Sequence, residues 1–156
     1  MDFNQLMNND NVEFKDIPPH AFLLGLLSAF DNRYQASADA FFKEITWKQF
    51  FAIICINLCK GNPTINELSE IMGSSHQNVK QILIKLEKKG FVCMIPDEKD
   101  KRKQRIKVTE QCNEFCDKNS KQSNEIMEKI FSGVSIENIM TTIQTIMSLE
   151  RNLEKI

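Results

Sequence analysis

The chain has 156 residues, of which 42% are apolar, enough for the core of one domain or of two closely fused subdomains. Its net charge is −1, yet residues 60–107 hold eleven Lys and Arg against six Asp and Glu, which gives this segment +5 and predicts a polyanion site. No secretory signal or membrane-length apolar stretch is evident, and the cysteines number five, an odd count. We therefore expect a cytoplasmic protein with reduced thiols and no membrane contact.

Two helices are predicted before the basic segment. Between residues 19 and 34 apolar side chains recur at helical spacing, and Pro18-Pro19 suits the first turn because proline lacks the amide that this position leaves unpaired. A second helix, at about 47–60, is almost wholly apolar, and Thr46 is a suitable N-cap for it. We expect this second helix to be the most buried of the chain.

A helix-turn-helix pattern lies in the basic segment. Thr64 and Glu67 form a capping-box pattern that opens a short helix, and Gly73 ends it. A second capping pattern, from Ser74 to Gln77, opens the next helix. Apolar residues of this next helix fall on one face, while its other face is polar: the apolar positions are Val79, Ile82, Leu83 and Leu86.

A basic hairpin and two long helices follow. Residues 91–95 and 105–109 have the composition of strands, joined by a charged loop. Helices are predicted at about 110–131 and after Ser135, with apolar stripes wider than a lone winged helix can cover. The predicted fold is mostly α with a small β-hairpin wing: a winged helix-turn-helix at 46–109, and a helical dimerisation region formed by 17–44 together with 110–156.

This arrangement predicts contacts with double-stranded DNA. The helix that starts at Ser75 would enter the major groove, where Gln77 and Asn78 can pair with base edges, while the helix N-terminus can hold a phosphate. An Arg at the hairpin tip suits the minor groove, and Asp97 and Asp100 can brace it by ion pairing. The predicted DNA-binding residues are Ser75, His76, Gln77, Asn78, Lys80, Gln81, Lys85, Lys99, Asp100, Lys101, Arg102, Lys103 and Arg105.

From Ile45 to Thr109 the sequence resembles the MarR family of bacterial transcriptional regulators. The matching pieces are INELSEIMG in the first helix, SSHQNVKQILIKLEKKGFV through the recognition helix, and the D-x-x-D-x-R pattern that ends in IKVTE at the wing. Departures fall at Ser74, Lys99, Lys101 and Cys112. The resemblance implies a homodimer on a pseudo-palindromic operator, with Asp100 and Arg102 matching the family's wing Asp and minor-groove Arg. Repression is the family's commoner mode.

The resemblance also implies release by an effector, either a small aromatic ligand or thiol oxidation, and less often a metal. Cys55 and Cys59 lie one turn apart in the most apolar helix, where the structural interpretation is a small buried side chain. Cys112 and Cys116 are also one turn apart, after the wing, and are the candidates for redox sensing. A metal site lacks further ligands near that pair, so neither a metal nor a cofactor is expected.

Two other functional classes compete with this interpretation. An enzyme is not expected, because no nucleophile, metal-protease or phosphate-loop motif is present. A winged-helix protein-interaction module without DNA binding remains the alternative. It would predict a neutral or acidic recognition helix and wing, in contrast to the basic segment here.

Overall fold

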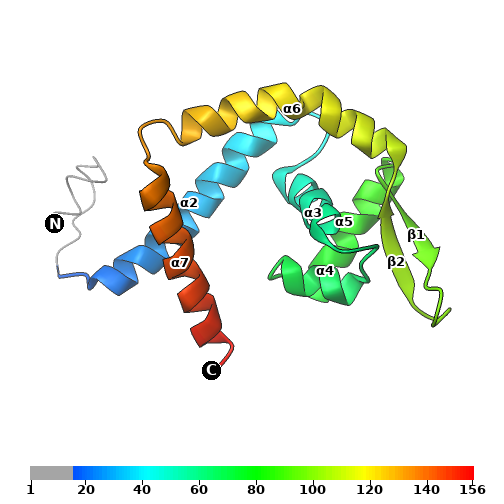
Figure 1. The fold of residues 1–156 in the computed structure, drawn as a ribbon, viewed down its shortest axis with the longest axis horizontal. Helices are drawn as coiled ribbons and strands as arrows, with labels where there is room; N and C mark the ends of the chain where they lie inside the picture. The colour runs from blue at the N-terminus through cyan, green and yellow to red at the C-terminus, as the bar shows by residue number, and fades with distance from the viewer. Residues whose placement is uncertain (1–15) are drawn as a thin grey trace. The chain divides into compact units, whose positions relative to one another are not determined.

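The computed structural model describes residues 16–156, and its architecture confirms the predicted class of a mainly helical chain with one β-hairpin (Figure 1). The chain divides into two compact units, one ending at Val108 and the other comprising Thr109–Ile156. The elements in order are α2 (Pro19–Phe41), α3 (Trp47–Leu58), α4 (Ile65–Ile71), α5 (His76–Lys88), β1 (Val92–Pro96), β2 (Gln104–Val108), α6 (Glu110–Ile130) and α7 (Ile136–Leu153). The assignment of both ends of the chain to one dimerisation region stays a prediction.

Side-chain caps fix where most of the helices begin. In α3, α4, α5, α6 and α7 the N-cap is a serine or threonine whose hydroxyl accepts a hydrogen bond from the third amide of the helix. The capping boxes belong to Thr46 and Thr64, with Gln49 and Glu67 as their partners. The predicted Ser74-to-Gln77 box is wrong: Ser75 caps α5, accepting from the amide of Asn78 at 3.3 Å.

The core of the first unit lies between α3, α4, α5 and the hairpin. Ile53, Leu68, Val79, Leu86 and Ile106 are fully buried there, one or two from each of these elements. Gly73 follows α4 with a positive φ of 57°, which a side chain at that position would disfavour. The turn that it permits sets α5 against α3, with the apolar face of α5 inward and the polar face outward.

The hairpin is an antiparallel pair that begins and ends one residue from its predicted bounds. Met94 pairs with Ile106 at its centre. The amide of Ile106 also donates to the carbonyl oxygen of Pro63 at 2.8 Å, so the loop before α4 hydrogen-bonds to β2. The wing is therefore attached to the helix-turn-helix by backbone as well as by side chains.

The first helix is longer than expected and has little buried surface. It runs seven residues beyond the predicted end at residue 34, and none of its side chains is buried. Its contact with α3 includes an edge-to-face pair between Tyr34 and Trp47, with ring centroids 4.6 Å apart. The Asp39 carboxylate accepts a hydrogen bond from the Trp47 amide, which holds the C-terminal part of α2 beside the start of α3.

The second unit consists of two helices that leave apolar side chains exposed. In α6 only Cys112 and Phe115 are buried, and α7 has no buried side chain. The exposed apolar residues of this unit are Met127, Ile130, Phe131, Val134, Ile136, Met140, Ile143, Met147, Leu153 and Ile156. None of the helices in residues 16–156 combines the length and the apolar character that a bilayer span requires.

Candidate nucleic-acid interface

The outer face of α5 is polar and open to solvent, as the sequence predicts. The side chains at His76, Gln77, Lys80, Gln81 and Lys85 are all exposed, while the opposite face packs into the core. The helix N-terminus carries unpaired amides, so this end also favours an anion. The face therefore combines amide groups that can read base edges with cations that can approach phosphates.

Asn78 differs from its exposed neighbours because its side chain already has a local partner. Its amide nitrogen donates to the hydroxyl of Ser74 at 2.8 Å. Ser74 is the last residue of the turn before the Ser75 cap, so this hydrogen bond joins the turn to the first part of α5. A base contact by Asn78 would use its remaining donor and its carbonyl oxygen.

The wing loop is organised around Asp97, which is 6% exposed. Its carboxylate accepts hydrogen bonds from the amides of Asp100 at 2.7 Å and Lys99 at 2.8 Å, and from the guanidinium of Arg105. The Asp100 amide, the Arg105 guanidinium and the Lys99 amide together lower the pKa of Asp97 from 3.8 to about 2. Asp97 is thus ionised at neutral pH and holds the loop in one conformation.

Arg105 fastens the base of the wing to the helix-turn-helix. Besides Asp97, its guanidinium donates to the carbonyl oxygen of Asn62 at 2.7 Å and lies 3.7 Å from the Glu67 carboxylate. Glu67 is itself part of the α4 capping box. The sequence predicts Arg105 to be a DNA contact and does not indicate this anchoring role. The only sequence signal was its place outside the loop, at the start of β2.

Arg102 extends from the tip of the same loop, and its side chain is 90% exposed. Its Nε lies 3.1 Å and its Nη2 3.4 Å from the two carboxylate oxygens of Asp100, as the predicted brace requires. The Arg102 side chain, together with its backbone amide, lowers the pKa of Asp100. One edge of the guanidinium is thereby oriented by Asp100, while the side chain stays exposed.

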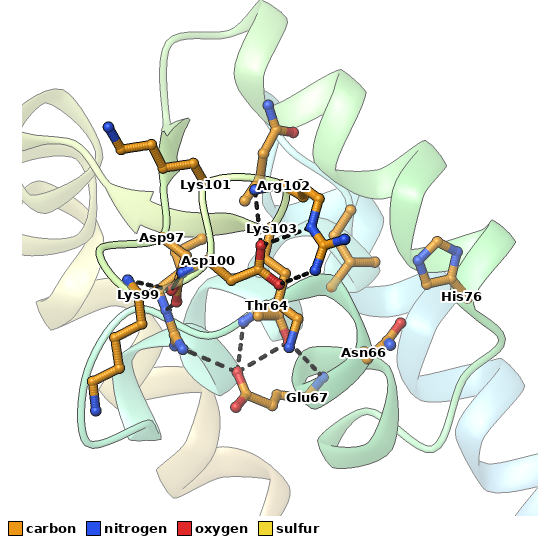
Figure 2. Close-up of a pocket in the computed structure, with 13 residues that line it drawn as sticks. Thr64, Asn66, Glu67, His76, Asp97, Lys99, Asp100, Lys101, Arg102 and Lys103 are labelled. Carbon is orange, nitrogen blue, oxygen red and sulfur yellow. Dashed lines mark hydrogen bonds and ion pairs between the residues drawn. The ribbon is translucent and has the colours of Figure 1, made fainter.

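These parts enclose an open groove of about 600 Å³ between the wing, the N-terminus of α4 and the start of α5. Figure 2 shows Arg102 extending from the wing loop, with the Asp100 carboxylate against it, toward the side of the groove where His76 stands. The wing-loop residues among its lining are Lys99, Asp100, Lys101, Arg102, Lys103 and Gln104. The groove therefore joins the two predicted DNA-contacting elements, the wing and the start of α5.

Residues 45–103 match the MarR family. The match covers nearly all of the sequence region that carries the resemblance, from α3 through α4, the turn and α5 to the wing loop. The chain thus has the fold of MarR-family transcriptional regulators, and the resemblance noted from the sequence is confirmed.

Solved MarR-family structures share this fold over nearly the whole chain. A MarR/EmrR family regulator from Acinetobacter sp. ADP1 has a TM-score of 0.78 at 16% identity, covering 90% of this chain and 100% of its own. MepR of S. aureus, solved in complex with DNA, has 0.72 at 17%, covering 88% and 99%. BpsR of Bordetella bronchiseptica, whose DNA binding is regulated by 6-hydroxynicotinic acid, has 0.72 at 14%, covering 89% and 96%.

A second cavity, of about 470 Å³, lies between α2, α3 and the helix-turn-helix. Aromatic side chains from α2 and α3 form part of its wall, and the turn before α5 forms another part. The lining residues are Asp31, Tyr34, Gln35, Trp47, Lys48, Phe51, Met72, Gly73, Ser74, Asn78 and Ile82. Asn78 thus borders the cavity and also lies on the predicted DNA-reading helix.

The two cysteine pairs of the chain have different surroundings. Cys55 is buried, as expected of a small apolar side chain, whereas Cys59 is half-buried. Cys112 is buried and Cys116 half-buried, and their thiols are hydrogen-bonded to each other. Within residues 16–156 no three His, Cys, Asp or Glu side chains gather as a metal site.

Proposed function

We propose that the protein is a sequence-specific DNA-binding transcriptional regulator that represses by occupying a pseudo-palindromic operator as a homodimer. Helix α5 would lie in the major groove and the wing in the minor groove. The observation that carries the proposal is the groove in which Arg102, exposed and braced by Asp100, borders the same space as the polar start of α5. MepR, a protein with this fold, forms a complex with DNA.

The polar side chains of α5 and of the wing would have different roles in binding. Gln77 and Asn78 carry amide groups, which suit hydrogen bonds to base edges in the major groove. Lys80, Lys85 and the wing lysines supply charge toward phosphates, which strengthens binding without reading sequence. Arg102 is the candidate for the minor groove, because its oriented guanidinium projects beyond the loop. Arg105 would act through the wing it anchors.

A homodimer follows from the apolar surface of the second unit. Helix α7 exposes Ile136, Met140, Ile143 and Met147, which recur at three- and four-residue spacing and so share one face. A face of this kind is stabilised by covering it with another apolar face, and a second copy of the chain supplies one. Two copies would present two recognition helices, which matches a pseudo-palindromic operator.

Release from DNA is proposed to follow the binding of a small aromatic molecule or thiol oxidation. The cavity bordered by Tyr34, Trp47 and Phe51 offers aromatic rings to stack on a planar ligand. Ser74 and Asn78 also border it, so an occupant can disturb the hydrogen bond between them and change the aim of α5. BpsR, with the same fold, responds to 6-hydroxynicotinic acid.

The deciding experiment measures the affinity of the full-length protein for the DNA upstream of its own gene and for a scrambled duplex, at two salt concentrations. We expect preference for the upstream DNA and an affinity that falls as salt rises. Absence of binding even at low salt would contradict the proposal and favour the protein-interaction module. Addition of planar aromatic acids in the same assay tests the effector.

Two variants test how the wing and α5 contact DNA. Arg102→Ala should weaken binding to the upstream DNA about tenfold, roughly 1.4 kcal/mol, without unfolding the protein. Gln77→Ala should reduce discrimination between operator and altered base pairs by about 1–3 kcal/mol, if its amide makes a bidentate contact. Lys60→Ala is the matched control, because Lys60 is an exposed cation of the basic segment that does not line the groove. Unchanged binding by both Arg102→Ala and Gln77→Ala would overturn the docking.

A further inference from the structure

Two adjacent serines hold different parts of Asn78. The hydroxyl of Ser75, the N-cap of α5, accepts a hydrogen bond from the Asn78 backbone amide at 3.3 Å. The hydroxyl of Ser74 accepts from the Asn78 side-chain Nδ2 at 2.8 Å. The first bond is the usual one at a capped helix start, whereas the second restrains an exposed side chain at the start of the proposed recognition helix.

The position of Ser74 is set by α4 and the turn rather than by α5. Its backbone amide donates to the carbonyl oxygen of Ser69 at 3.0 Å, directly after Gly73 with its positive φ of 57°. Ser69 is buried, and its hydroxyl donates to the carbonyl oxygen of Ile65 at 2.7 Å. Asn78 is therefore oriented by a chain of hydrogen bonds that begins in α4.

This restraint leaves Asn78 with a defined hydrogen-bonding edge. A side-chain amide has two N–H donors and one carbonyl oxygen. Ser74 uses one donor, so one donor and the carbonyl oxygen remain for a ligand. In the major groove adenine presents one acceptor, N7, and one donor, the N6 amino group, whereas guanine presents two acceptors. The remaining edge of Asn78 thus complements adenine, and at guanine it would place an acceptor against an acceptor.

We propose that Ser74 is a positioning residue for base recognition, and that Asn78, held by it, reads an adenine in each half of the operator. This inference rests on the proposed function and deepens it by naming the base. Asn78 accepts from the N6 amino group and donates to N7, while Ser74 keeps the second amide donor away from the base. Holding the side chain in place also lowers the conformational entropy lost on binding. Without the Ser74 hydroxyl, the amide is free to turn and offer both donors to guanine.

The first measurement needs no DNA. In isotope-labelled full-length protein, the NMR signal of the Asn78 side-chain amide is assigned by its loss in Asn78→Asp, and nitrogen relaxation reports how freely the side chain moves. We expect a restrained amide in the wild type and in Ser74→Thr, which keeps the hydroxyl, and a mobile one in Ser74→Ala. Equal mobility of Asn78 in the wild type and in Ser74→Ala would overturn the inference.

Asn119 is the internal control for this measurement. Its Nδ2 donates to the backbone oxygen of Phe115, four residues back in α6, at 2.8 Å, so it is an asparagine with the same kind of restraint in another helix. Its side-chain amide should stay restrained in the wild type and in both Ser74 variants. A change confined to Asn78 then reports the loss of the Ser74 hydroxyl and not a general loosening of the protein.

Base preference is measured by selecting bound duplexes from a randomised library at a single salt concentration. The position read by Asn78 is the one whose preference is lost in Asn78→Ala. We expect the wild type and Ser74→Thr to select adenine there, and Ser74→Ala to lose about tenfold of the preference for adenine over guanine. Ser75→Ala is the matched control: it removes the neighbouring hydroxyl, which caps α5, and should weaken binding to all duplexes without changing the selected bases.

A duplex with 7-deazaadenine at this position lacks only the N7 acceptor. It should bind the wild type about tenfold more weakly than the ordinary duplex, and should bind Asn78→Ala no differently. If Ser74→Ala and the wild type select the same bases, or if the wild type selects guanine at this position, the inference is wrong while the proposed function stands. If no duplex is bound even at low salt, the proposed function and the adenine contact both fail, and only the hydrogen bond between Ser74 and Asn78 stands on the relaxation data.

Discussion

The winged helix buries many of its apolar side chains, whereas the two helices after it leave most of theirs exposed. Among the described residues, fourteen of the sixteen buried apolar side chains lie between positions 42 and 106, and only Cys112 and Phe115 lie beyond. Helices α6 and α7 are about as long as any in the chain, yet α7 buries nothing. Among the described residues, the first region thus buries an apolar core of its own, whereas the second leaves most of its large apolar side chains exposed.

Polar groups show the same difference. In the wing, Asp97, Arg105 and Glu67 form one connected set of hydrogen bonds and ion pairs with the backbone of neighbouring loops. In α7 the hydroxyls of Thr142, Thr145 and Ser148 donate to carbonyls one turn back on their own helix, and the Ser148 hydroxyl also accepts from Arg151 of the same helix. One region is specified by contacts between elements, and the other by local helix formation alone. Its tertiary partners would have to come from elsewhere, which a second copy would provide.

The largest expected effect is on the free energy of unfolding of the winged helix. Leu86 is fully buried on α5, so Leu86→Ala removes core contacts and leaves a cavity that costs about 2–5 kcal/mol of unfolding free energy. Ile143→Ala on α7 is the matched control, because Ile143 is 43% exposed and the same kind of truncation should cost far less at protein concentrations too low for association. Urea unfolding followed by circular dichroism measures both. Equal losses of unfolding free energy in the two variants would contradict the difference in burial between the winged helix and α7.

The next effect is on association. Ile143 and Met147 lie one turn apart on the exposed face of α7, so an aspartate at either position would be buried without a partner in a dimer. We expect Ile143→Asp or Met147→Asp to raise the dimer dissociation constant at least thirtyfold, about 2 kcal/mol, in analytical ultracentrifugation. Thr141→Asp introduces the same charge on the opposite side of the helix and should leave association intact. A monomeric wild-type protein would contradict the dimer proposal directly.

Much of this architecture could be predicted because it depends on residues that are close together in the sequence. Thr46 and Thr64 mark helix starts by capping, and the spacing of Val79, Ile82 and Leu86 gives the inner face of α5. The capping pattern also gave one wrong prediction, the cap at Ser74. Ser74 and Ser75 are adjacent, and each is followed three residues later by a polar residue. The structure resolves that choice in favour of Ser75, because the turn at Gly73 leaves Ser74 as the partner of the Asn78 side chain.

The candidate site was only partly predictable, because its organisation depends on contacts between distant segments. The ion pair between Asp100 and Arg102 is local, and the spacing of the two residues suggested it. The contact of Arg105 with Asn62 joins residues 43 positions apart, and no sequence pattern reports such a distance. Likewise, the hydrogen bond that distinguishes the α6 cysteine pair from the α3 pair is invisible to spacing, since both pairs are four residues apart.

The smallest expected effect tests whether the wing depends on its internal charge network. The pKa of Asp97 is lowered to about 2 from 3.8, so ionised Asp97 stabilises the folded loop above about pH 4, and this contribution is lost as pH falls through about 2. Asp97→Asn should remove it at neutral pH as well. We expect faster amide hydrogen exchange confined to residues 97–105, and a several-fold weaker affinity for DNA because the wing is less ordered.

Glu98→Gln is the control, because Glu98 is the exposed neighbour of Asp97. This substitution removes the same charge but leaves the hydrogen bonds between Asp97 and the loop amides in place. It should leave both hydrogen exchange and DNA affinity close to those of the wild type. If the two variants behave alike, the Asp97 hydrogen bonds do not order the wing and only net charge matters. If Asp97→Asn loosens the wing while α7 exchanges as before, the network acts within the winged helix, as the contrast between the two regions requires.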